Sequence, residues 1–75
     1  MDSLDWQSIP MDPLTERQIQ VLTLIAEGKT VEEIAAALFL SAHTIRTHVR
    51  NIRVSLHARS TPHAVAKAIR AGLLQ

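Results

Sequence analysis

The chain of 75 residues contains no cysteine, so disulfide bridges and thiolate-based zinc sites are excluded. Its only aromatic residues are Trp6 and Phe39, so any core has to be aliphatic. No apolar run approaches the roughly 18 residues that a membrane-spanning helix needs. The acidic N-terminus also lacks the basic and apolar segments of a signal peptide. We therefore expect one small, soluble, cytoplasmic domain without a membrane association.

Acidic residues are missing from the whole second part of the chain, beyond Leu40. All seven acidic residues lie before that point, against two basic ones, which leaves the first part five charges negative. The second part carries six basic residues and all four histidines, although the chain as a whole is only +1. Such asymmetry between halves is typical of proteins that bind nucleic acid or another acidic surface.

The four histidines do not form a recognisable metal or catalytic site. No two of them are four residues apart, the spacing that places two ligands on one helix face. A Ser-His-Asp triad would need an acid near His48, and this part of the chain has none. We therefore expect no enzymatic activity, no bound metal and no cofactor.

Helix start and stop signals predict an all-α fold of four helices in residues 14–75, after an acidic tail in residues 1–13. The first two helices each begin with capping-box spacing, in which two side chains three residues apart satisfy free backbone amides. Gly often follows a helix end, and Pro is tolerated in a first turn. The expected signals are Thr15, Gln18 and Gly28 for the first helix, Thr30 and Glu33 for the second, Ser41 for the third, and Thr61, Pro62 and Gly72 for the fourth.

The third helix, about residues 42–57, is rich in β-branched residues, which by themselves favour a strand. Four apolar residues nevertheless recur with the spacing of one helical stripe, and the arginines follow one residue later, roughly 100° around the helix. We expect packing of the apolar stripe to override weak propensity and to leave the basic stripe free of competing acids. The apolar stripe is Ile45, Val49, Ile52 and Leu56, and the basic stripe is Arg46, Arg50 and Arg53.

Two stripes are also expected on the fourth helix. The inward one consists of Val65, Ala68, Ile69 and Leu73. The outward one consists of Ala64, Lys67, Ala71 and Leu74. Small residues beside an exposed leucine suit a two-fold contact between two copies of the chain. An ordinary solvated surface is the alternative.

A short helix joined by a tight turn to a basic helix indicates a helix-turn-helix. Three segments carry a family signature, namely "LTERQIQVLTLIAEGKT" from Leu14, "EEIAAALFLSAHTIRTHVRNI" from Glu32 and "AVAKAIRAGLL" from Ala64. Together they resemble the LuxR-type (GerE-like) helix-turn-helix domain, here as a stand-alone domain. The resemblance implies a transcription regulator that binds double-stranded DNA as a homodimer, with the third helix in the major groove and the fourth at the dimer contact.

The resemblance also implies which residues meet DNA, and the chemistry of the residues agrees. Arginine can bond guanine through two donors, and a threonine methyl group can touch thymine. Free amides at a helix start favour anions such as phosphate. For Arg53, phosphate contact and plain solvation are equally open. The expected base contacts are Arg46, Thr47 and Arg50, and the expected phosphate contacts are Thr30, Ser41, His43, Thr44 and Arg53.

Some positions depart from the family pattern. Glycine is common where this chain has His57, and a lysine that suits phosphate is common where it has Ser55. A second class of function also stays open, a protein-interaction module of the same fold. Such a module would sequester a related regulator or dock on RNA polymerase.

Overall fold

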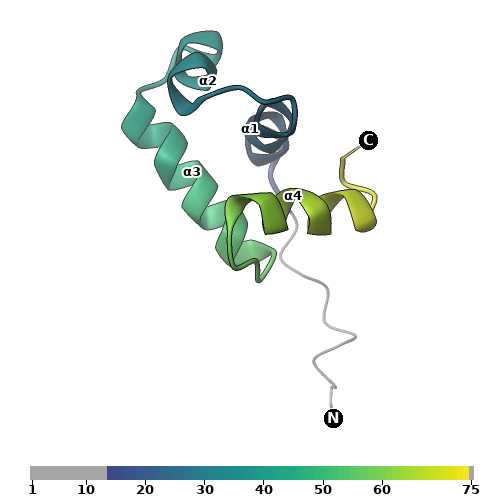
Figure 1. Ribbon diagram of the computed structural model, residues 1–75. Coiled ribbons are helices and arrows are strands. Elements are labelled where there is room, and N and C mark those ends of the chain that lie inside the picture. The colour runs from purple at the N-terminus through teal and green to yellow at the C-terminus, as the bar shows by residue number, and fades with distance from the viewer. Residues whose placement is uncertain (1–13, 75) are drawn as a thin grey trace.

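The structure, a computed structural model, describes residues 14–74 and contains four α-helices in them (Figure 1). The helices are α1 (Glu16–Ala26), α2 (Val31–Leu38), α3 (Ala42–Ser55) and α4 (Thr61–Arg70). The expected all-α fold is therefore confirmed. The acidic tail expected in residues 1–13 lies outside the described residues. Within the described part, no helix has the length and apolar character needed to cross a membrane.

Like α1, helix α3 contacts each of the other three helices, so much of the core is built around it. In Figure 1 it runs along one side, with α2 near its first turns and α4 near its last. Ile45, Ile52 and Leu56 are fully buried and Val49 is half-buried, which confirms the expected apolar stripe. Burying one such side chain contributes about 1.5–3 kcal/mol. That exceeds the propensity cost of at most about 0.7 kcal/mol per residue, so the branched residues are helical.

The expected starts of the first three helices are confirmed. In α2 the Thr30 amide donates to Glu33 Oε1 at 2.8 Å, and the Glu33 amide donates back to Thr30 Oγ1 at 3.1 Å. Thr15 and Gln18 form the same reciprocal pair at α1. At α3 the hydroxyl of Ser41 accepts a hydrogen bond from the backbone of the first turn. These caps satisfy amides that have no partner inside their own helix.

Helix α4 has a different cap from the one expected. The hydroxyl of Ser60 accepts a hydrogen bond from the His63 amide at 3.2 Å, so Ser60 is the N-cap. Thr61 is therefore the first helical residue, and the expectation that it caps the helix is wrong. Serine and threonine are both good caps, and proline is tolerated at either of the next positions. The path of the loop between α3 and α4 decides whether Ser60 or Thr61 takes the cap position.

The chain leaves α2 and α3 through residues in the left-handed backbone conformation. Phe39, between α2 and α3, has φ 58°, and His57 has φ 55°. The turn at His57 ends α3 at Ser55, two residues before the expected end. Residues other than glycine are sterically strained in this conformation. The Phe39 side chain is moreover 93% exposed, so packing does not compensate for that strain.

We expect Phe39→Gly to raise the free energy of unfolding by about 0.5–1 kcal/mol. Relief of the left-handed conformation contributes about 1–2 kcal/mol. The greater freedom of glycine in the unfolded chain removes about 0.4–1 kcal/mol of that gain. Urea denaturation measures the difference. Gly28→Ala, at φ 92° and with open space around the added carbon, is the control and should destabilise. A Phe39→Gly variant that unfolds at lower urea than the parent chain would contradict the prediction.

The inward side of α4 differs from the expected one. Ala64 and Ala68 are fully buried and Leu74 is 7% exposed, whereas Ile69 is 50% and Leu73 is 37% exposed. The distance between packed helices depends on the side chains at their contact, and small ones allow a close approach. Helix α4 therefore packs on the core through Ala64, Ala68 and half-buried Val65, which confirms the inward placement of Val65 and Ala68. The expectation that Ala64 and Leu74 are available to a partner is wrong, as is the inward placement of Ile69 and Leu73.

Candidate nucleic-acid interface

The expected base-contacting residues share the exposed side of α3. Arg46, Thr47 and Arg50 are all exposed, and the two arginines are one helical turn apart. Buried Ile45 and Ile52 hold this helix against the core, so the position of the exposed side is fixed. Within residues 14–74 the guanidinium of Arg50 has no hydrogen-bond or ion-pair partner. Its donors are therefore available to a ligand.

Thr47 keeps its hydroxyl within its own helix. The hydroxyl donates to the carbonyl of His43 at 3.1 Å. The donor is thereby used, and the methyl group is left for an apolar contact. A methyl group at this position has the chemistry to touch the methyl of thymine.

The first turn of α3 gathers three of the expected phosphate contacts. The Thr44 amide donates to Ser41 Oγ at 3.0 Å, and the Ser41 hydroxyl donates to Thr44 Oγ1 at 2.9 Å. His43 is exposed beside them. The partial positive charge of a helix start favours an anion at this place. The polar groups and the helix end therefore point to the same kind of ligand.

Thr30 stands apart from that group, at the start of α2, and is also exposed. Its hydroxyl accepts a hydrogen bond from the Glu33 amide. The hydrogen bond from the Thr30 backbone amide holds the pKa of the Glu33 carboxyl below its usual value. Glu33 is therefore occupied in capping α2, and its charge is held at the helix start.

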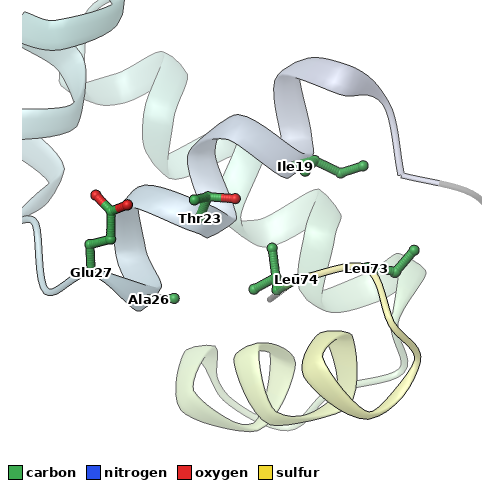
Figure 2. Close-up of a pocket in the computed structure, with 6 residues that line it drawn as sticks. All are labelled: Ile19, Thr23, Ala26, Glu27, Leu73 and Leu74. Atoms are coloured by element: carbon green, nitrogen blue, oxygen red, sulfur yellow. The ribbon is translucent and has the colours of Figure 1, made fainter.

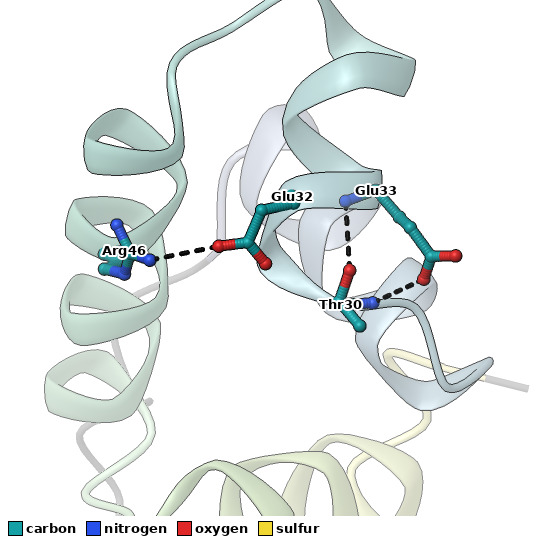
Figure 3. A network of polar contacts seen from close by, with 4 residues as sticks. All are labelled: Thr30, Glu32, Glu33 and Arg46. Carbon is teal, nitrogen blue, oxygen red and sulfur yellow. Dashed lines mark hydrogen bonds and ion pairs between the residues drawn. The ribbon is translucent and has the colours of Figure 1, made fainter.

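The neighbouring acid, Glu32, reaches the basic side of α3 (Figure 3). Its Oε2 lies 3.3 Å from Nη2 of Arg46, with the two side chains 70% and 60% exposed. The expectation that the basic stripe is free of competing acids is therefore wrong. The two residues are 14 positions apart and belong to different helices. Charge pattern alone gave no signal for the pair, because the contact depends on how α2 crosses α3.

Arg53 and Lys67 are bound to the connection between α3 and α4. Arg53 is half-buried, and its Nη2 donates to the carbonyl of Arg59 at 3.2 Å. Lys67 Nζ donates to the carbonyl of His57 at 3.3 Å. The Arg59 amide in turn donates to His63 Nδ1 at 3.0 Å. Arg53 is thus not simply solvated, because one of its nitrogens is bound to this connection.

A pocket lies between α1 and the segment that follows α4 (Figure 2). Its only ionisable side chain is that of Glu27, so it offers no acid–base pair. Among residues 14–74, no group of three or more histidine, aspartate or glutamate side chains is placed to hold a metal. The pocket is lined by Ile19, Thr23, Ala26, Glu27, Leu73 and Leu74.

The chain matches known proteins over most of its length. Residues 12–68 match a family described as "Bacterial regulatory proteins, luxR family". The sequence is 36% identical to the spore germination protein GerE of Bacillus subtilis (strain 168) over 75 residues, which is 100% of this chain and 99% of GerE. The solved structure of the transcription factor GerE superimposes with a TM-score of 0.81 at 26% identity, over 83% of this chain and 92% of that one.

Longer proteins match as well. The transcriptional regulatory protein LiaR of B. subtilis (strain 168) is 40% identical over 63 residues, which is 84% of this chain but 30% of LiaR. The response regulator protein VraR of Staphylococcus aureus (strain Mu3 / ATCC 700698) is 40% identical over 62 residues, 83% of this chain and 30% of VraR. The chain thus spans about 30% of the length of these two relatives.

Proposed function

The chain belongs to the luxR family of bacterial regulatory proteins, which are helix-turn-helix, DNA-binding transcription regulators, and we propose that it reads an inverted-repeat DNA site as a homodimer. The exposed side of α3 carries the proposal. Arg46 and Arg50 stand there one turn apart, on a helix that the core holds in place. An α-helix fits the major groove, where each base pair presents its own pattern of donors and acceptors.

In the proposed complex the bases are read by three residues. Arg46 and Arg50 bond guanine O6 and N7, and each such pair contributes about 1–3 kcal/mol of discrimination. The methyl group of Thr47 contacts thymine. Arg53 can add a phosphate contact, because its hydrogen bond to the Arg59 carbonyl uses only one of its nitrogens. The phosphates are held at the starts of α2 and α3, by Thr30, Ser41, His43 and Thr44.

The proposed dimer contact is the exposed apolar surface at the end of α4, around Ile69 and around Leu73 in the segment that follows the helix. Exposed apolar patches on a small domain are a common mark of an interface. Ile69 and Leu73, which are exposed, take the place of buried Ala64 and Leu74 in the proposed dimer contact. Dimeric helix-turn-helix proteins place their recognition helices about 34 Å apart, so the target has two half-sites in inverted orientation.

Selection of bound sequences from a random DNA pool tests the function directly. We expect enrichment of an inverted repeat whose half-sites are one helical turn apart. Binding to the selected site and to random DNA is then compared as the salt concentration rises. Phosphate contacts make both affinities fall steeply with salt, while the preference for the selected site persists. If no sequence is enriched, the proposal that the chain reads a DNA sequence is wrong. If a single unpaired half-site is enriched, the proposal that it binds as a dimer is wrong.

A further inference from the structure

The ion pair between Glu32 and Arg46 joins the two helices of the helix-turn-helix at its exposed surface (Figure 3). Ion pairs at this level of exposure contribute about 0–1 kcal/mol to stability. The core residues around α3 contribute far more. The pair is thus not needed to hold α2 against α3, and its main consequence concerns the position of the Arg46 side chain.

Glu32 carries a charge that the local structure favours. It lies in the first turn of α2, where the helix dipole stabilises an anion. The adjacent Glu33 closes the capping box, so the Glu32 carboxylate remains available for Arg46. Arg50, one turn along, has no such partner among the described residues. Of the two arginines expected to read bases, Arg46 is therefore held by an ion pair and Arg50 is not.

The carboxylate affects phosphate and guanine contacts of Arg46 differently. A guanidinium has five donors, and the recorded contact uses one nitrogen of Arg46. The neutral guanine edge can take two further donors while the ion pair persists. A phosphate that approaches Arg46 meets the negative charge of Glu32 and is repelled. Contacts with phosphate are weakened by Glu32, and contacts with guanine are retained.

We propose that Glu32 is a specificity-determining positioning residue, which holds Arg46 for base reading and withholds it from the phosphates of non-specific DNA. This inference rests on the proposed function, because it takes α3 to be the helix that enters the groove. Its effect is on the ratio of specific to non-specific affinity. Glu32 itself does not contact the bases.

The variant Glu32→Gln tests this proposal, because it removes the charge and keeps the size and helix preference of the side chain. Affinity for random DNA should rise about 10-fold at 50 mM salt, and its log–log salt slope should steepen by about 0.9, the effect of one added phosphate contact. Affinity for the selected site should change no more than about 2-fold, because its guanine contact is already made. Discrimination between the two DNAs therefore falls.

Glu27→Gln is the matched control, because it removes the charge of another exposed glutamate that does not pair with Arg46. In an Arg46→Ala background, Glu32→Gln should act no more strongly than this control does. An equal rise in affinity for both DNAs, as with the control, would overturn the role of Glu32 and leave the proposed function intact. A parent chain that prefers no sequence would overturn the proposed function, and this inference with it.

Discussion

Arg46→Ala and Arg50→Ala are each expected to reduce the preference for the selected DNA site by about 5–150-fold. The loss follows from the proposed two-donor contact of each arginine with guanine, which contributes about 1–3 kcal/mol of discrimination. Both side chains are exposed, so the helical content and the midpoint of thermal unfolding should hardly change. Electrophoretic mobility shift or fluorescence anisotropy titrations on selected and random DNA measure the effect.

The two substitutions should differ in their effect on random DNA. Arg50 has no partner in the described part of the chain and is free to contact phosphate, so Arg50→Ala should weaken non-specific binding as well. Arg46 is paired with Glu32, so Arg46→Ala should act mainly on the selected site. Arg17→Ala, which removes an exposed arginine of α1, is the control for net charge. Two alanine variants that discriminate as well as this control would show that α3 does not read the bases.

Ile69→Asp combined with Leu73→Asp is expected to convert the proposed dimer into a monomer. The two side chains are 50% and 37% exposed, so their replacement removes little of the core. Two charges in an apolar contact lose their hydration without a partner, which prevents association. Affinity for the inverted repeat should fall about 100-fold or more, because linked binding at two half-sites raises the affinity by a factor of about 10²–10⁴. Affinity for one isolated half-site should fall much less, because only the added negative charge acts on it.

Light scattering or sedimentation gives the mass, and DNA titrations give the affinities. Val54→Asp is the control for the mass measurement alone, because Val54 is 67% exposed but lies on α3, the proposed DNA-reading helix. It should leave the mass unchanged. A doubly substituted chain that keeps the mass of the parent, or that binds the repeat as tightly, would place the dimer contact elsewhere.

The sequence by itself determined where the first three helices begin and which side of α3 is buried. Capping depends on residues three positions apart, so Thr15, Thr30 and Ser41 could be recognised from spacing alone. On α3, large apolar residues recur at helical spacing and arginines lie beside them. A helix buries the apolar residues and exposes the arginines only when its apolar side faces the core. The exposed position of Arg46, Thr47 and Arg50 follows from the same pattern.

Only the tertiary structure decided the contacts that depend on how two helices meet. In and after α4, hydropathy favoured Ile69 and Leu73 for the core, but the structure buries Ala64, Ala68 and Leu74 there and leaves Ile69 and Leu73 exposed. The pairing of Glu32 with Arg46 and the hydrogen bond from Arg53 to Arg59 likewise join separate segments. Periodicity describes one helix at a time, whereas the distance and crossing of neighbouring helices depend on side chains from both.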